Sequence, residues 1–364
     1  MVEEATFDKE TRMMDVDEAA ERLGFPAGAR AWLNGLPVPA DVQLPANPQA
    51  LLDFCGVADN DQREMLAARP DPEAHPEWWA VVSAMAASLE QNLDKPIPST
   101  GFQGWPVVPA ASSPVGLFAA AWALLSALPR LLDRHERRGV PDAVSRATAS
   151  ALGGVMGTHR HLTGRPGVGL MPLWGPPLRF RGADFEIGRH SFTRAELGLG
   201  DGVAGHVLMI HVPPIGPLDP SSSERSVAEA ARLFDQCYPD EPVTAFVCNS
   251  WLLDPQLAEY LPEDCNIRRF QRRFDVLPLL PPQDPYDDDR DMMRIGLHLS
   301  PPTGPFTAED LERVPQKTTL QRAFVAHLRT GRHWQKRTGI LRSDEALTSW
   351  PATDARARPA GRTA

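Results

Sequence analysis

The spacing of apolar residues changes once along this 364-residue chain, near Gly164. Before that point, apolar residues recur at steps of three and four, which is the period of an amphipathic helix. After it, short apolar runs separated by turn residues predict strands. The segment Gly164–Pro177 between the two patterns is rich in glycine and proline, which is typical of a linker. The sequence therefore predicts two domains.

The first domain is predicted to be all-α and to cover residues 1–164. Its most regular helix is predicted over residues 76–93, where four apolar side chains share one face: Trp79, Val82, Met85 and Leu89. Further helices are predicted over residues 15–23, 28–36, 47–56, 114–132 and 142–162. No strand is predicted before Gly164.

The second domain is predicted to be mixed α/β and to cover residues 165–344. Its strands are predicted over residues 177–182, 183–192, 205–213, 243–251, 274–280 and 292–300. Its helices are predicted from residue 220 within the segment 214–239, and over residues 255–261 and 318–334. The first two strands are expected to pair across Gly182 and Ala183 and to continue into a meander, whereas the later strand–helix–strand order favours a local parallel pair. Residues 345–364 are predicted to be a disordered tail.

The net charge is −10, from 37 basic and 47 acidic side chains. A phosphate backbone repels an acidic protein, so sequence-independent nucleic-acid binding is not expected. The basic runs Arg268–Arg273 and Arg329–Arg342 are interpreted as solvated faces.

The cysteines and the N-terminus indicate a cytoplasmic protein. Four cysteines are spaced too widely for a disulfide framework or a zinc ribbon: Cys55, Cys237, Cys248 and Cys265. The acidic N-terminus lacks the apolar core of a signal peptide. The most apolar run, Val115–Leu128, is short for a bilayer span and predicts a buried helix. We therefore expect a reducing compartment and no membrane partner.

Strong catalytic motifs are missing from the sequence. It contains no G-x-S-x-G elbow, no Walker loop, no H-E-x-x-H and no G-x-G-x-x-G after a strand. His159 and His161 form an H-x-H pair, but residues two apart on a helix point to different sides. Because no carboxylate-rich segment accompanies them, no metal site is predicted.

The segment Ile215–Ser223 follows a buried strand and begins a helix, where free backbone amides can hold an anion. Gly216 permits a close approach, and Ser221 and Ser222 offer hydroxyl groups. Asp219 is placed to cap the helix, and its negative charge argues against a bound phosphate. An anion site and a capped surface helix both remain open.

Polar and aromatic residues gather where the strand over residues 243–251 ends, a common position for sites in α/β sheets. They are Cys248, Asn249, Ser250 and Trp251. A nucleophilic cysteine would need a neighbouring base, which the sequence does not reveal. The alternative is that Cys248 and Trp251 are packing residues.

Two further side chains have the chemistry of acid–base catalysts. His211 lies near the end of a strand and has an intrinsic pKa suited to a general base at neutral pH. Tyr260, on the short helix after the polar cluster, has the chemistry to donate a proton to a leaving group. A structural role is the alternative for each of them.

Three strings carry a resemblance to a known family: SWLLDPQLAEYLP, NIRRFQRRF and TTLQRAFVAHLRTGRHW. Over residues 15–340 the chain resembles the actinobacterial and firmicute proteins described as acyltransferase domain-containing. These proteins have a helical N-acyltransferase-type N-terminal domain and a GNAT-like C-terminal domain. The resemblance implies an α+β fold with a bent, mostly antiparallel sheet. In it two parallel strands, Val207–Val212 and Val243–Cys248, would splay apart and admit an acyl-CoA.

The resemblance also implies roles for individual residues. It places the general acid at Tyr260. His211, which would end the first splayed strand, is expected from that position to act as the general base. The acyl donor is expected to contact Val212, Ile215, Gly216, Ser221 and Ser222. The acceptor is expected to contact Asn249, Ser250 and Trp251.

One motif departs from the family pattern, because the usual Q/R-x-x-G-x-G/A loop is replaced here by PPIGPLDPSSS. The expected function is that of an N-acyltransferase, which moves an acyl group from acyl-CoA or acetyl-CoA to a small-molecule amine by direct attack. The departure leaves an acyl carrier protein or an aminoacyl-tRNA open as the donor. A non-catalytic binding protein and a hydrolase with Cys248 as nucleophile also remain open.

Overall fold

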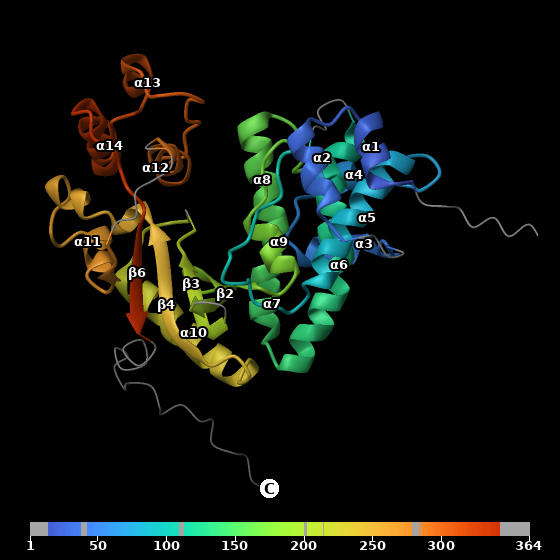
Figure 1. Ribbon diagram of the computed structural model, residues 1–364, viewed down its shortest axis with the longest axis horizontal. Coiled ribbons are helices and arrows are strands. Elements are labelled where there is room, and N and C mark those ends of the chain that lie inside the picture. Colours follow the sequence, from blue (N-terminus) through green and yellow to red (C-terminus); the bar gives the residue numbers. More distant parts are fainter. Residues whose placement is uncertain are drawn as a thin grey trace, which may run out of the picture. The chain divides into compact units, whose positions relative to one another are not determined.

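The computed structural model of the chain describes residues 14–37, 42–108, 113–199, 202–213, 215–278, 284 and 286–342 (Figure 1). The predicted disordered tail, residues 345–364, lies outside the described residues. The chain forms two compact units. The first comprises residues 1–96 and 101–185, and the second comprises residues 97–100 and 186–364.

The first unit is helical, as the sequence predicts. Its helices are α1 Val16–Arg22, α2 Ala27–Asn34, α3 Pro48–Phe54, α4 Asp59–Ala67, α5 Pro76–Gln91, α6 Pro114–Arg138, α7 Asp142–Ala149, α8 Ala151–Thr163 and α9 Gly175–Phe180. The single helix predicted over residues 142–162 is in fact two, α7 and α8, which meet at Ser150. Ser150 favours the break because its hydroxyl donates to the carbonyl of Ala147.

Helix α6 forms the centre of the first unit. Ser113 caps its start by accepting from the amide of Gly116, and Gly139 ends it with a φ of 75°. Trp122 and Phe118 are fully buried on it. In the described part of the chain, α6 alone is long and apolar enough to cross a membrane, and 78% of its apolar window is buried inside the protein. Such burial is usual for a core helix.

The contacts divide the chain after Phe185, whereas the composition change led us to expect a boundary between residues 164 and 165. The intervening segment belongs to the helical unit because it supplies part of its core. Val168, Leu173 and Phe180 are all buried there. Composition marks where the helical pattern stops, but burial decides which core a segment joins.

The second unit is built on an open six-stranded sheet with the order β1-β2-β3-β4-β6-β5. Its strands are β1 Asp184–Ile187, which straddles the boundary, β2 His190–Leu199, β3 Gly202–His211, β4 Val243–Ser250, β5 Asp275–Val276 and β6 Arg337–Arg342. The pairs β2–β3, β4–β6 and β5–β6 are antiparallel, and β3–β4 is parallel. The predicted local parallel pair and the mostly antiparallel sheet are confirmed. A meander also forms, but from β1, β2 and β3, and the predicted pairing across Gly182 and Ala183 is wrong.

Helices accompany the sheet along the chain. They are α10 Pro220–Cys237, η1 Trp251–Leu253, η2 Pro255–Glu259, α11 Asn266–Gln271, α12 Asp287–Asp291, the π-helical turn η3 Met292–Gly296, α13 Ala308–Glu312 and α14 Thr319–Arg329. Helix α10 connects β3 to β4 and contacts β2 and β4 (Figure 1). Its inner residues Val227 and Phe234 are buried. The β3–α10–β4 crossover is what makes β3 and β4 parallel.

Two strand predictions are wrong. Residues 177–182 fall largely in helix α9, because Pro176 and Pro177 fit its first turn. The tight turn before β2 lies at Gly188 and Arg189, and not at Gly182 and Ala183 as predicted. Residues 292–300 begin with the π-helical turn η3, in which the consecutive Met292 and Met293 are both buried, unlike alternating strand residues.

The last part of the sheet also differs from the prediction. The strand predicted over residues 274–280 has only two residues in a ladder, Asp275 and Val276. Its neighbour β6 was missed, because its sequence RTGILR has few apolar residues and directly follows a segment predicted as helix up to Trp334. Helix α14 ends at Arg329 instead.

Candidate functional site

Strands β3 and β4 stay paired for only part of their length. Their parallel ladder ends at Met209 and Val247. Beyond this point each strand keeps its outer partner: His211 pairs with Ser191 of β2, and Ser250 pairs with Arg337 of β6. The facing edges of β3 and β4 are therefore unpaired at their carboxyl ends. This is the divergence expected between these strands, and we call it the β3–β4 wedge.

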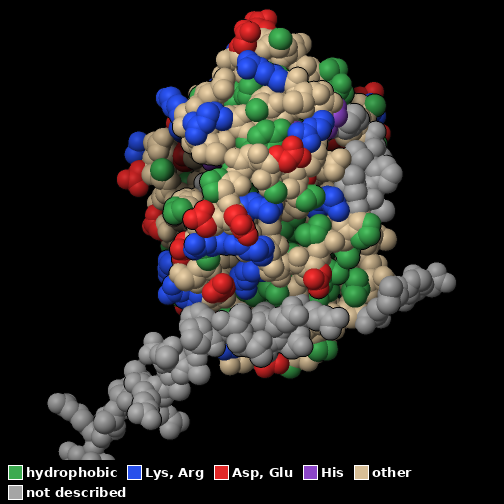
Figure 2. Space-filling model, turned by 90° about the vertical axis from the view of Figure 1, so that its left-hand side faces the viewer, with side chains coloured by type: hydrophobic (Ala, Val, Ile, Leu, Met, Phe, Trp, Pro, Cys, Tyr) green, Lys and Arg blue, Asp and Glu red, His purple; other side chains and the backbone are tan. Residues whose placement is uncertain are grey.

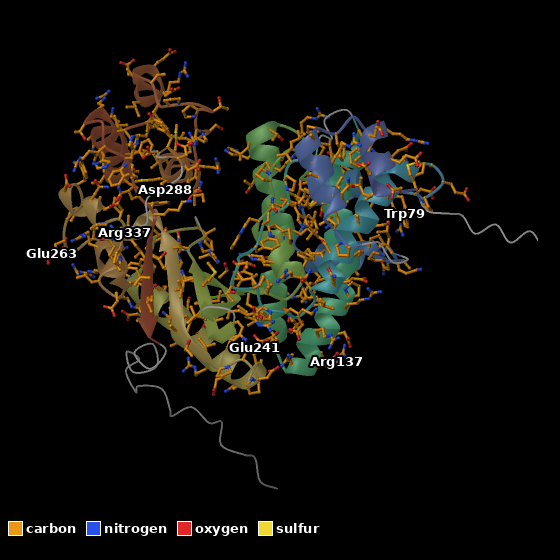
Figure 3. All side chains as sticks on the ribbon, in the orientation of Figure 1. Trp79, Arg137, Glu241, Glu263, Asp288 and Arg337 are labelled. Atoms are coloured by element: carbon orange, nitrogen blue, oxygen red, sulfur yellow. The ribbon has the colours of Figure 1, made fainter. Side chains whose placement is uncertain are left out.

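Such a wedge suits an extended ligand that carries amide groups. The unpaired strand edges present backbone N–H and C=O groups, which otherwise need partners from water or a ligand. Figure 3 shows the side chains around the sheet and labels Arg337 at the start of β6.

His211 is the last residue of β3 and stands at the wedge. Its Nε2 lies 3.0 Å from the hydroxyl oxygen of Thr193 on the neighbouring strand β2. The side chain is half-buried. Because Thr193 is itself fully buried, it restricts the rotation of the imidazole ring. The predicted general base thus has a fixed orientation at the end of one wedge strand.

Cys248 lies on the other wedge strand but is poorly suited to nucleophilic chemistry. Its side chain is 1% exposed. Burial raises the pKa of the Cys248 thiol to about 12, so it stays protonated at neutral pH. The hypothesis of a hydrolase that uses Cys248 therefore lacks an activated nucleophile, and the packing role is favoured.

The three residues predicted on the acceptor side have different surroundings. Asn249 is exposed and donates from Nδ2 to the hydroxyl of Thr338 at 3.1 Å. Ser250 caps η1 by accepting from the amide of Leu252 at 3.1 Å. Trp251 is only 6% exposed and packs so closely on Gly296 that a Cβ there would lie 2.6 Å from the indole. Of the three, Trp251 is surrounded as a packing residue is.

Tyr260 ends η2 and belongs to a separate hydrogen-bond network. Its hydroxyl lies 3.1 Å from Nδ1 of His327 and accepts from Arg332 at 3.0 Å. Nε2 of His327 lies 3.2 Å from the carbonyl oxygen of His333. Since a carbonyl only accepts, Nε2 carries the hydrogen, and Nδ1 accepts the phenolic proton. Burial lowers the pKa of His327, which keeps it neutral.

Two buried carboxylates organise the segment before β6, and the sequence analysis missed their role. Asp254 accepts from the amide of Gln335 at 2.8 Å. Asp289 accepts from Nδ1 of His333 at 2.6 Å and from the amide of Trp334 at 2.8 Å. Burial raises the pKa of both Asp254 and Asp289, and both are fully buried. The sequence shows only an Asp-Pro step at Asp254 and an acidic run at residues 287–291, and neither local pattern reveals contacts with the segment before β6.

At the start of α10, the hydroxyl groups predicted to contact the acyl donor are already bonded to Asp219. Its Oδ2 accepts from the Ser221 hydroxyl at 2.7 Å, and from the Ser222 amide and hydroxyl at 2.9 Å each. These bonds, the one from Ser221 foremost, lower the pKa of Asp219. The Ser223 amide bonds the Asp219 carbonyl. The capped helix is therefore real, and it leaves few donors for an anion.

The loop between β3 and α10 has donors of its own. Within the described residues, the amides of Val212, Ile215 and Gly216 have no protein acceptor. Ile215 and Gly216 are exposed, and Gly216 has a φ of 61°. An oxyanion or a phosphate oxygen is the kind of group that such amides bind.

Charges of both signs cover the surface of the second unit. On the face shown in Figure 2, basic and acidic side chains are interspersed. Arg332 pairs with Glu259, and Arg272 donates to the carbonyl of Glu263. The described residues contain no group of three or more His, Cys, Asp or Glu side chains placed to hold a metal ion.

Comparisons with family models divide the chain much as the contacts do. Residues 46–181 match the model described as the N-acyltransferase N-terminal domain. Residues 185–341 match the model described as the GNAT-like C-terminal domain. No curated protein matches the chain.

Solved structures give a closer comparison. The chain is similar to an acyltransferase in complex with CoA and 10C-teicoplanin, with 29% identity and a TM-score of 0.77. It is also similar to an acyltransferase in complex with decanoyl-CoA, with 30% identity and a TM-score of 0.76. Each match covers 90% of this chain and 99% of the other.

Proposed function

Because this chain belongs to the acyltransferases in which an N-acyltransferase N-terminal domain precedes a GNAT-like C-terminal domain, we propose that it acylates an amine of a small-molecule acceptor. The chain is an acyltransferase, and its donor is an acyl-CoA. The observation that best supports the site is the β3–β4 wedge, where the ladder stops at Met209 and Val247 while both outer ladders continue.

The proposed reaction is a direct attack. The amine nitrogen of the acceptor attacks the thioester carbonyl, the new C–N bond forms, and the C–S bond breaks. The thioester is already activated, so the protein contributes mainly by positioning the amine, removing its proton and stabilising the oxyanion. No covalent acyl-enzyme is needed, in keeping with the protonated thiol of Cys248.

We assign the proton transfers to His211 and Tyr260, the two side chains predicted to be acid–base catalysts. His211 accepts the amine proton, directly or through water, and Thr193 holds its ring. The free amides of Val212 and Ile215 bind the oxyanion. Tyr260 protonates the departing thiolate, and Arg332, which donates to the same phenolic oxygen, stabilises the phenolate that remains.

The similar acyltransferases suggest a class of acceptor. One of them is bound to teicoplanin and another to 10C-teicoplanin, and decanoyl-CoA is bound in two of the structures. We propose for this chain a glycopeptide-sized amine as acceptor and a medium-length acyl chain as donor. Asn249 and Ser250 line the acceptor side.

A turnover assay tests this proposal. The protein is incubated with acetyl-CoA or decanoyl-CoA and with teicoplanin or a simple amino sugar. CoA release is followed with a thiol reagent, and the mass of the acceptor is measured by mass spectrometry. We expect the mass of the acceptor to increase by one acyl group. We also expect faster turnover with decanoyl-CoA than with acetyl-CoA. Acyl-CoA binding without any CoA release would instead favour a non-catalytic binding protein.

We also propose a cytoplasmic location. The support is chemical: all four cysteines are free thiols, and three of them are buried.

A further inference from the structure

The loop from Val212 to Asp219 lacks the glycine pattern of the family, yet one arginine from another part of the sheet binds it. The guanidinium of Arg189, in the turn before β2, donates to three loop carbonyls. Nε bonds Pro217 at 3.1 Å, Nη1 bonds Pro213 at 2.8 Å, and Nη2 bonds Gly216 at 3.2 Å. Three bonds from one planar group fix the path of the loop.

This arrangement separates the donors of the loop from its acceptors. The carbonyl oxygens of Pro213, Gly216 and Pro217 face the guanidinium. The amides of Gly216 and Leu218 have no acceptor among the described residues. A diphosphate is attracted to amide N–H groups and is repelled by carbonyl oxygens. Carbonyl oxygens of the loop are therefore bonded to Arg189, whereas its open amides can bind an anion.

The turn that carries Arg189 is itself fixed to α10. The amide of Arg189 donates to the hydroxyl of Ser226 at 2.6 Å, and that hydroxyl donates to the carbonyl of Ser222 at 3.0 Å. Gly188 has a φ of 62°, and a Cβ there would lie 2.5 Å from the Ser226 hydroxyl. The position before Arg189 must therefore be glycine for this contact to form.

The neighbouring His190 extends the same junction. It is fully buried, its Nε2 lies 2.7 Å from the hydroxyl of Ser223, and burial lowers its pKa to about 3. A neutral imidazole adds no charge near the loop. The positive charge that reaches the loop in this turn therefore comes from Arg189.

We propose that Arg189 is the positioning residue for the diphosphate of acyl-CoA. It replaces the missing glycine-rich loop by holding three carbonyls away from the phosphates and by placing a positive charge beside them. Two of its five N–H groups remain for a phosphate oxygen. This inference rests on the proposed function, in which acyl-CoA is the donor at the β3–β4 wedge.

The test compares two donors with Arg189→Ala. One donor is decanoyl-CoA, and the other is the decanoyl thioester of N-acetylcysteamine, which lacks the diphosphate. The variant is expected to raise KM for decanoyl-CoA by about 10- to 100-fold, the range for losing charge-assisted hydrogen bonds. It is expected to leave the KM of the short thioester nearly unchanged, and any loss of kcat that comes from a looser Ile215 amide should be the same with both donors. Arg189→Lys keeps the charge but not the three bonds, so an intermediate KM is expected.

Arg225→Ala is the matched control. Arg225 is an exposed residue near the same end of α10 that interacts electrostatically with Asp219 and has no hydrogen bond to a loop carbonyl among the described residues, so its loss removes an equal charge without freeing the loop. The proposal would be overturned if Arg189→Ala raised KM equally for both donors. It would also be overturned if Arg225→Ala and Arg189→Ala raised KM for decanoyl-CoA equally. Circular dichroism and thermal unfolding establish that each variant is folded. If the wild-type protein neither binds nor uses decanoyl-CoA, it is the proposed function that fails.

Discussion

Tyr260 has the chemistry of a general acid, but in the structure its proton is directed to Nδ1 of His327. In the proposed reaction the phenol must turn from this acceptor to the leaving thiolate. Arg332 and the ring of Trp334, 5.7 Å away, keep the side chain in place meanwhile. The contacts of Tyr260 are thus compatible with a catalytic role and with a structural role, and kinetic measurements distinguish the two.

Tyr260→Phe keeps the ring and its packing but removes the proton. If Tyr260 is the general acid, the variant should lower kcat by about 10²- to 10⁴-fold while it remains folded. His211→Ala should lower kcat within the same range if His211 is the base. Steady-state turnover of decanoyl-CoA measures both. Near-wild-type rates in both folded variants would return these residues to structural roles.

Asp219 places a carboxylate beside the amides proposed for the diphosphate. Asp219→Asn keeps an acceptor for the cap but removes the charge, so KM for decanoyl-CoA should fall by about 2- to 10-fold. Bonds from Ser221 and Ser222 lower the pKa of Asp219, so the carboxylate stays charged at pH values above that lowered pKa. The KM of the wild-type protein divided by the KM of Asp219→Asn should therefore be constant above about pH 5. An unchanged KM at low ionic strength would place the diphosphate elsewhere.

Cys248 tests whether the acyl group passes directly to the amine or first to the protein. Because burial raises the pKa of its thiol to about 12, no acyl-thioester should form on it. Cys248→Ala should keep kcat within about threefold, and intact-protein mass spectrometry during turnover should show no acylated protein. A stable acyl adduct that disappears in Cys248→Ala would contradict direct attack.

At the scale of elements, the residues that form the wedge were predictable and the sheet edge beside it was not. Strands β3 and β4 and helix α10 have unbroken apolar patterns and clear caps, so their order and parallel pairing follow from the sequence. Strand β6 depends on tertiary contacts: its start is fixed by Asp254 and Asp289, which accept from the amides of the segment before it. Such long-range hydrogen bonds leave no local signature.

Gly339 in β6 shows how tightly this edge is packed against the rest of the unit. A Cβ at this position would lie 2.7 Å from Cδ1 of Leu253 and 2.8 Å from Cβ of Phe274. Gly339→Ala should lower the free energy of unfolding by about 1–3 kcal/mol. Urea unfolding measures this change, with Gly304→Ala as the control because a Cβ there meets nothing within 4 Å. Equal stability of the two variants would mean that the edge adapts easily.

For the whole molecule, the sequence predicted a helical part followed by a mixed part, together with the kind of chemistry. Family models and solved acyltransferases agree with that organisation over most of the chain. The site was only partly predictable. His211 was found at the wedge from its strand position, whereas Arg189 was not, because its role comes from reaching a loop that lies more than twenty residues later in the chain. Trp251 was selected for its place in the cluster where β4 ends, with a packing role as the alternative, and it is buried.

We expect acyl-CoA to bind in the β3–β4 wedge and beside the loop that follows β3. Hydrogen–deuterium exchange with and without saturating decanoyl-CoA tests this binding mode, because the unpaired amides there should exchange rapidly in the free protein. The ligand should slow exchange in peptides that cover residues 210–218 and 248–250, and exchange in a peptide from α5 should be unchanged. Unchanged exchange in both wedge peptides at saturating ligand would contradict this binding mode.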